Sequence, residues 1–337
     1  MDFFRQQDRA RRQTRMLIVA FGAAVLAILL AMNVVALFIF GQAAGGDQGP
    51  VVPRSLDAAL PVIAVTSAIT LAVILIASLY RTVQLRGGGS RVARELGGVE
   101  VDGSTSDPLR RRLLNIVEEM AIASGVPVPE VFVLDHEDGI NAFAAGWSPA
   151  DAAVAVTRGA LENLSREELQ GVIAHEFSHV FNGDMRLNIR LMGVLFGILV
   201  LAVAGRKMLS SMRYSGRGRK GGGIVLAALA VMLIGYIGLF FGRWIQAAVS
   251  RQREYLADAS AIQFTRSPDG IAGALTKIGA ATSGSQLEVN TEEVGHMLFA
   301  SGLASRMFAT HPPLVERITR IRPEFDPGEF AQVAASM

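Results

Sequence analysis

Two long uncharged apolar runs constrain this sequence more than any other feature. Neither the first run, Met16 to Phe40, nor the second, Ala58 to Tyr80, contains a charged residue. As a helix the first would measure about 37 Å, and the hydrocarbon core of a bilayer is roughly 30 Å thick. In the whole chain 51% of residues are hydrophobic and 18% are charged, which is more apolar surface than one soluble core needs. We therefore expect a multi-pass membrane protein with a transmembrane helix pair at 16–80.

A cleaved signal peptide is the alternative explanation of the first run. Arginines precede that run and the small residues of "GQAAGG" follow it, as they would around a cleavage site. However, the run is longer than an ordinary signal core, and a second apolar run follows it directly. We therefore favour a membrane span.

The basic residues that flank the two runs predict which way the chain crosses. Cytoplasmic segments near membrane spans carry an excess of Lys and Arg. Only Arg54 lies between the runs, whereas arginines are frequent on both outer sides. The N-terminus, 1–15, and the chain after residue 80 are therefore predicted to face the cytoplasm. The flanking arginines are Arg5, Arg9, Arg11, Arg12 and Arg15 before the first run, and Arg81, Arg86, Arg91 and Arg94 after the second.

Two later apolar runs, 191–204 and 224–242, leave the number of crossings open. The first is short for a span, and between them lies a basic, Gly-rich stretch, 205–223, which we expect to be a loop. If both runs cross, this loop lies outside, against the distribution of charge elsewhere. If both are re-entrant, it stays inside. Either way the number of crossings is even, so the parts at 81–190 and 243–337 lie on the same side.

The polar segments around this second pair predict an α+β domain that the pair interrupts. Asp107 as N-cap, Pro108 and Gly125 predict a helix between them. The segments "EVFVLD" and "AAVAVT" predict strands on either side of "GINAFAAG". Ser165 and Glu168 have the spacing of a capping box and begin a second helix. "IQAAVSRQREYLADASAIQF" predicts a third helix after the membrane pair.

The helix after the capping box carries a pattern typical of a metal site. His175 and His179 lie four residues apart, so both imidazoles project from one face, and Glu176 can reach a water at the metal. Neutral imidazole suits Zn²⁺. The chain has no cysteine, so a carboxylate must supply the third ligand, and Glu254 and Asp258 both qualify. One would bind the metal and the other would hold a ligand imidazole through its far nitrogen. The alternative is a pair of solvated histidines.

Four motifs in order resemble one family. "NAFAAG", "AHEFSHVFNGD", "SRQREYLADASA" and "THPPLVERI", together with hydrophobic pairs before and within the soluble part, are similar to the HtpX-type membrane zinc metalloproteases, relatives of the CAAX prenyl proteases. The resemblance runs from about residue 10 to residue 323. It implies a gluzincin-type metallopeptidase domain with one Zn²⁺ per chain. The chain departs from the prenyl proteases in its membrane part, which has at most four apolar runs instead of a large multi-helix chamber.

The resemblance also implies roles for individual residues. His175, His179 and Glu254 correspond to zinc ligands, Glu176 to the general base, and Asp258 to a carboxylate that supports a ligand histidine.

Two further motifs correspond to groups that contact the substrate. His311 of "THPP" corresponds to a histidine that stabilises the oxyanion, with a helix-start residue as the alternative. Asn141, Ala142, Phe143 and Ala144 correspond to the edge strand that binds the substrate backbone. We assign no site role to His136, in a polar turn, or to His296, in a helix.

Taken together, these patterns predict a membrane-bound zinc endopeptidase that cuts misfolded or unfolded membrane proteins. We expect it in the plasma (inner) membrane, with the catalytic part in the cytoplasm, and we expect polypeptides and the lipid bilayer as partners. A net charge of +2 gives no reason to expect a nucleic-acid partner. The alternatives are a prenyl-peptide protease of the CAAX type and a non-proteolytic membrane chaperone or scaffold with structural zinc.

Overall fold

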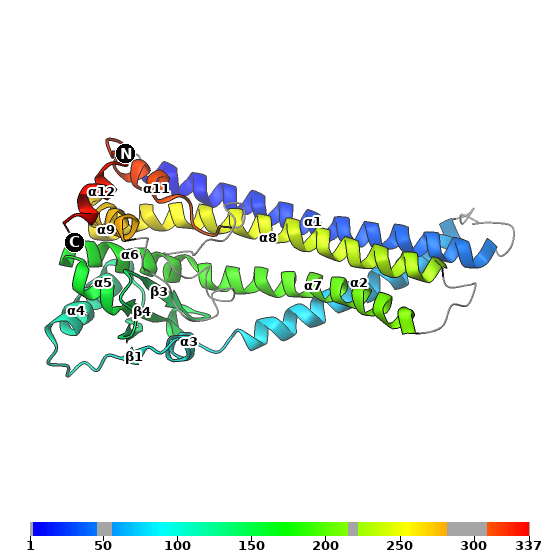
Figure 1. Ribbon diagram of the computed structural model, residues 1–337, viewed down its shortest axis with the longest axis horizontal. Coiled ribbons are helices and arrows are strands. Elements are labelled where there is room, and N and C mark those ends of the chain that lie inside the picture. The colour runs from blue at the N-terminus through cyan, green and yellow to red at the C-terminus, as the bar shows by residue number, and fades with distance from the viewer. Residues whose placement is uncertain (1–2, 46–55, 215–221, 282–308, 337) are drawn as a thin grey trace. The chain divides into compact units, whose positions relative to one another are not determined.

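A computed structural model describes residues 3–45, 56–214, 222–281 and 309–336 (Figure 1). It divides into two compact units, each built from separate parts of the chain. The mixed unit comprises Met1–Met16, Arg86–Asn188 and Ala247–Met337, and the helical unit comprises Leu17–Leu85 and Ile189–Gln246.

The mixed unit contains a four-stranded sheet among its described residues, with the order β1-β2-β4-β3. β2 and β4 pair in parallel, whereas β3 pairs with β4 in the antiparallel direction, with Ala142 opposite Val156. In the described part of the chain β3 therefore lies at one edge of the sheet, with one side of its backbone not paired to another described strand. The strands are β1 (Val99–Glu100), β2 (Glu130–Leu134), β3 (Ala142–Ala145) and β4 (Ala153–Thr157).

Local signals explain where two helices of this unit begin. The Asp107 side chain accepts a hydrogen bond from the Leu109 N–H, at 2.9 Å, at the start of α4 (Pro108–Ser124). The Ser165 and Glu168 side chains form both hydrogen bonds of a capping box at the start of α6 (Arg166–Asn182). The other described helices are α3 (Gly89–Glu95), η2 (Pro149–Asp151), α5 (Arg158–Asn163), α9 (Asp269–Ala280), α11 (Leu314–Ile321) and α12 (Glu329–Ala334).

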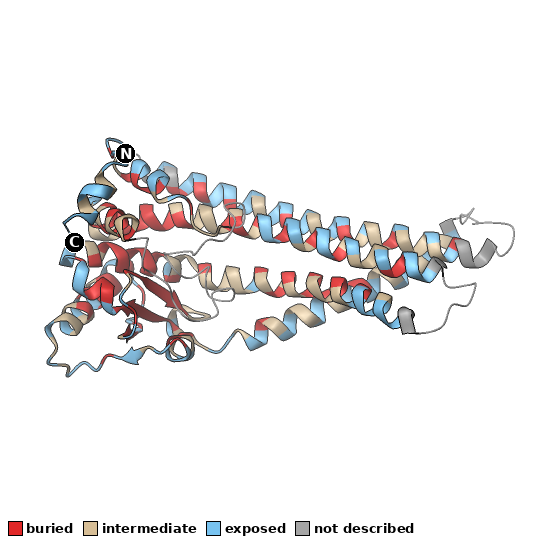
Figure 2. Ribbon diagram, in the orientation of Figure 1, coloured by how far each residue is buried: buried red, intermediate tan, exposed pale blue. Residues whose placement is uncertain are grey.

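The core of the mixed unit lies between the sheet and α4 and α6. Leu113 and Ile116 of α4, Ile173 and Phe177 of α6, and Val154 of β4 are all buried in one cluster. Figure 2 shows this concentration of buried residues around the strands and α6. Burial of both faces of the central strands explains their continuous Val/Ala runs. α6 is thus held rigidly against the sheet.

The helical unit is built from α2 (Leu56–Gln84) and from most of α1 (Phe3–Gly45), α7 (Asp184–Tyr214) and α8 (Gly222–Thr265). The beginnings of α1 and α7 and the end of α8 belong to the mixed unit. Among the described residues these four helices are long and apolar enough to cross a membrane. Large apolar side chains such as Leu26, Leu75 and Phe241 are exposed on them, as Figure 2 shows for the helices as a whole. Lipid is the environment in which such surfaces are stable.

Small and polar residues hold these helices together. A Cβ at Gly235 of α8 would lie 2.5 Å from the Ala202 backbone nitrogen of α7, so only glycine permits this approach. The Asn33 side chain of α1 donates a hydrogen bond to Ser67 Oγ of α2 at 2.8 Å. Both features are typical of helix packing in a membrane.

The structure confirms the predicted fold class and corrects one predicted loop and one predicted boundary. Residues 205–214, which we expected in a loop, continue α7 as helix, because Lys, Arg, Met and Leu are good helix formers even where the apolar run ends. Residues 215–221 of that stretch lie outside the described residues. α8 also continues without a break past residue 242, where we expected a boundary. The other predicted domain boundaries stay predictions.

Candidate active site

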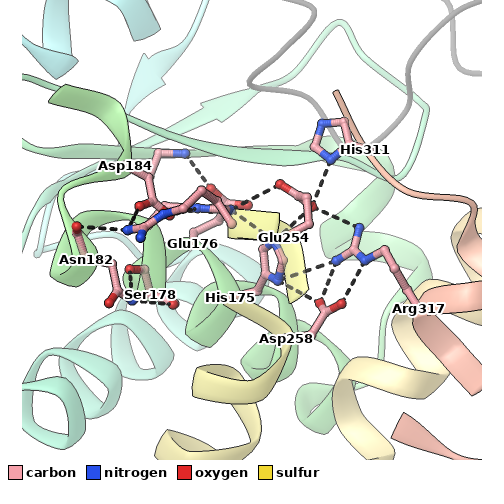
Figure 3. A network of polar contacts seen from close by, with 12 residues as sticks. His175, Glu176, Ser178, Asn182, Asp184, Glu254, Asp258, His311 and Arg317 are labelled. Carbon is pink, nitrogen blue, oxygen red and sulfur yellow. Dashed lines mark hydrogen bonds and ion pairs between the residues drawn. The ribbon is translucent and has the colours of Figure 1, made fainter. Parts of the chain in front are cut away.

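α6 and α8 bring together three side chains that can hold one metal ion (Figure 3). His175 and His179 lie one turn apart on α6, and Glu254 faces them from α8. One ligand atom from each lies within 4.8 Å of the other two. The side chains of His175 and Glu254 are 1% and 6% exposed, so burial holds them in place.

The far nitrogens of the two imidazoles explain why these side chains fit a cation. His175 Nδ1 lies 3.0 Å from Asp258 Oδ1, and His179 Nδ1 lies 2.8 Å from Asp184 Oδ2. In neutral imidazoles each Nδ1 therefore carries the hydrogen and donates it to a carboxylate. Each Nε2 atom then carries a lone pair. The two Nε2 atoms lie 3.1 Å apart, and each lies 3.5 Å from a Glu254 oxygen. Two imidazoles and a carboxylate form a donor set that suits Zn²⁺.

Glu176 lies between this donor set and the edge strand. Its Oε2 accepts a hydrogen bond from the Ala144 N–H of β3 at 2.7 Å. Burial raises the pKa of Glu176 above its ordinary value, although the His179 and His175 imidazoles act in the opposite direction. The arrangement fixes one carboxylate oxygen and makes the carboxyl group a better proton acceptor.

Arg317 of α11 is fully buried behind the ligands. It contacts Asp258 Oδ1 at 2.6 Å, Asp258 Oδ2 at 2.9 Å and Glu254 Oε2 at 3.2 Å. Burial alone would lower the pKa of Arg317, but the carboxylates of Asp258 and Glu254 raise it above its ordinary value. The guanidinium therefore stays charged and fixes both carboxylates.

His311 contacts a proposed metal ligand, and Asn141 adjoins the edge strand. His311 Nδ1 lies 2.8 Å from Glu254 Oε2, and its side chain is 9% exposed. Asn141 immediately precedes β3, and its Oδ1 accepts a hydrogen bond from the Ala142 N–H at 2.9 Å. Of the ten residues predicted for the site, six lie together at the α6–α8 pair, and the other four, 141–144, lie at the sheet edge, where Ala144 contacts Glu176. Their roles stay predictions.

Comparison with known proteins identifies the family. The model of Peptidase family M48 matches residues 108–324. The Protease HtpX homolog of Thermoanaerobacter pseudethanolicus is 41% identical over 215 residues, which are 62% of this chain and 71% of that protein. The chain belongs to peptidase family M48. The Protease HtpX homolog of Dictyoglomus turgidum is also 41% identical, over 62% of this chain and 68% of that protein.

The crystal structure of Ste24p from S. mikatae is similar to this chain. The matched region covers 95% of this chain and 67% of the Ste24p chain. The two chains are 17% identical in sequence, with a TM-score of 0.49. The family and the HtpX relatives confirm the predicted activity: the chain is a membrane-bound metallopeptidase, and M48 peptidases depend on zinc in general.

Two residues of this M48 site were missed in the sequence. Arg317 falls between Leu314 and Ile321 on the apolar face of α11, and a charge on such a face is the signal that was available. Asp184 lies only five residues after His179, beyond Gly183, and its place at the end of "AHEFSHVFNGD" is the signal that was available. His136 is exposed in a turn as expected, and His296 lies outside the described residues.

Proposed function

We propose that this M48 peptidase is an endopeptidase that holds one Zn²⁺ per chain on His175, His179 and Glu254. The observation that carries the proposal is the convergence of both Nε2 atoms on Glu254 while both Nδ1 atoms face carboxylates. When bound, zinc supplies Lewis acidity, which polarises the scissile carbonyl and makes water more acidic. The remaining chemistry belongs to the side chains around it.

Glu176 is the general base in this proposal. The Ala144 N–H fixes its Oε2, and burial raises its pKa, so that it can take a proton from the attacking water. The same carboxyl group then gives the proton to the leaving amine. His311 is the donor that we assign to the negative charge on the carbonyl oxygen. Arg317 holds Glu254 and Asp258 in their orientations without contacting substrate.

The substrate segment binds in extended form along β3. Backbone groups alternate along a strand, and the Ala144 N–H points to Glu176, so Ala142 and Ala144 present their backbone groups to the same unpaired side. An incoming strand would accept and donate hydrogen bonds there, next to Asn141 and Phe143. Such pairing reads backbone more than side chains, which favours unfolded polypeptides as substrates.

The helical unit supports a narrower choice of substrate. Four apolar helices and the arginines near 1–15 and 81–94 support a multi-pass protein of the plasma (inner) membrane with its catalytic part in the cytoplasm. A site so anchored meets misfolded or unfolded segments of membrane proteins, which is the quality-control role we propose. A chaperone with structural zinc is less favoured, because structural sites close with four protein ligands and this donor set has three among the described residues.

The test compares the detergent-solubilised chain with its Glu176→Gln variant. We expect one zinc per chain in both proteins, and a loss of about 10²-fold or more in casein cleavage in the variant. Glu162→Gln, which changes an exposed carboxylate of α5, is the matched control and should retain full activity. Equal cleavage by wild type and Glu176→Gln would contradict the assignment of the base. Absence of zinc from the wild type would contradict the metal site.

A further inference from the structure

The junction between α6 and α7 consists of a single residue. α6 ends at Asn182, α7 begins at Asp184, and Gly183 between them has a φ of 69°. Such a left-handed conformation suits glycine and ends a helix sharply. Because the chain turns here immediately after His179, the placement of that histidine depends on how the junction is held.

Arg253 of α8 contacts the residues on both sides of this junction. Its guanidinium donates a hydrogen bond to the Asn182 carbonyl oxygen at 3.0 Å and forms an ion pair with Asp184 Oδ1. The side chains of Arg253 and Asp184 are only 13% and 10% exposed. A largely buried ion pair of this kind has a more defined geometry than a solvated surface pair.

The second carboxylate oxygen of Asp184 completes the chain of contacts to the metal site. Asp184 Oδ2 lies 2.8 Å from His179 Nδ1. Arg253 is also the residue before Glu254 on α8. The contacts therefore join the region of one proposed ligand, Glu254, to another ligand, His179, by a route that does not pass through the metal.

The same arrangement occurs at the other histidine. His175 Nδ1 contacts Asp258, and Asp258 contacts Arg317. Each histidine thus faces a carboxylate, and each carboxylate faces a largely buried arginine. The charge of the arginine fixes the carboxylate, the carboxylate fixes the tautomer and orientation of the imidazole, and Nε2 remains available to a cation.

We infer that Asp184 and Arg253 are positioning residues that set the affinity of the site for zinc. This inference rests on the proposed function. Contacts to the far nitrogen of a ligand histidine typically change metal affinity by about 10–100-fold. Asp184→Asn keeps the size of the side chain and an acceptor oxygen but removes the charge that attracts both Arg253 and the imidazole N–H. Arg253→Met removes the contacts with Asn182 and Asp184 while preserving most of the side-chain length.

The experiment measures the zinc dissociation constant of the full chain in detergent by competition with a chromophoric chelator. Asp184→Asn and Arg253→Met should each weaken zinc binding by about 10-fold or more. Asp135→Asn is the matched control, because it breaks a partly exposed Asp–Arg pair with Arg110 in the same unit. Its zinc affinity should equal that of the wild type. Unfolding of the zinc-free proteins is measured in parallel, to show that the variants are folded.

A second measurement separates positioning from a purely structural role. Casein cleavage by Asp184→Asn should recover when free zinc is raised by the factor that its affinity has lost. Wild-type affinity in both variants would overturn the inference and leave the proposed metal site intact. Lost cleavage that extra zinc does not restore, with affinity unchanged, would also overturn it. A wild type without zinc would instead overturn the proposed function.

Discussion

Arg317 contacts two carboxylates on α8 and also lies 3.4 Å from His175 Nδ1 on α6. A guanidinium reaches several atoms at once in a fixed plane, whereas an ammonium is a point charge. A buried carboxylate that loses its hydrogen-bonded partner is costly, because nothing replaces the water it gave up. The orientation of Glu254 and Asp258 therefore depends on the shape of Arg317 as well as on its charge.

Arg317→Lys tests this dependence on shape. We expect casein cleavage to fall by about 10-fold or more, because one ammonium cannot replace contacts to both oxygens of Asp258 and to Glu254. Cleavage and bound zinc are measured on the same preparation. Arg320→Lys, in the exposed Arg320–Glu316 pair of the same helix, is the control. If Arg317→Lys and Arg320→Lys retain equal activity, the charge alone is sufficient.

The sequence predictions for single residues rested on the spacing of those residues along a helix. Positions four apart on a helix share a face, so His175 and His179 could be paired without any knowledge of the fold. Between Glu254 and Asp258, residue chemistry alone left the assignment open, and the structure places Glu254 near both Nε2 atoms and Asp258 at a far nitrogen. Arg317 could not be assigned, because its partner Asp258 is 59 residues away and only packing brings them together.

β3 is the element on which the proposed substrate binding depends. Its unpaired side presents Ala142, whereas Ala145 belongs to the alternate set of residues that faces β4. Proline removes one backbone donor and is tolerated in an edge strand only where that donor does not pair within the sheet.

Ala142→Pro and Ala145→Pro separate binding from folding. Ala142→Pro should raise KM for an extended peptide by about 10-fold, the loss of roughly one hydrogen bond. It should lower thermal stability less than Ala145→Pro does, because the N–H it removes donates to the Asn141 side chain and not to the sheet ladder. Ala145→Pro should lower the unfolding temperature, because it removes a donor from the β3–β4 ladder. Steady-state kinetics and thermal unfolding are measured for both. An unchanged KM in Ala142→Pro would contradict substrate pairing at this edge.

Elements with local boundary signals could be predicted, and those without could not. The caps at Asp107 and Ser165 correctly located the starts of α4 and α6. β1 has only two residues and no alternation, so its sequence gives no signal of a strand. α7 extends beyond its apolar run because helix formation depends on backbone propensity, whereas hydropathy reports only which part of a helix suits lipid.

The proposed metal would join two helices that meet within the mixed unit. Its ligands come from α6 and α8, and a ligand that binds only the folded state stabilises that state by about 4 kcal/mol at a thousandfold excess over Kd. The helical unit, Leu17–Leu85 and Ile189–Gln246, contributes no ligand from its described residues.

Removal of zinc should therefore affect the units unequally. After treatment with a chelator, we expect faster amide hydrogen exchange in α6 and around Glu254 of α8, and unchanged exchange in α2. Mass spectrometry of peptic fragments measures both regions in one sample, and zinc added back provides the control. Equal acceleration in α2 would mean that the metal stabilises the chain as a whole.

The unpaired side of β3 has a further consequence for solubility. A sheet edge that accepts foreign strands is also a template on which copies of one protein can aggregate. Here the edge has four residues, and the side chains of Asn141 and Glu176 already accept the N–H groups of Ala142 and Ala144. These internal acceptors protect the edge: another chain must displace the Asn141 side chain before it can pair at Ala142, while the Ala144 N–H stays with Glu176. Self-association is thereby disfavoured.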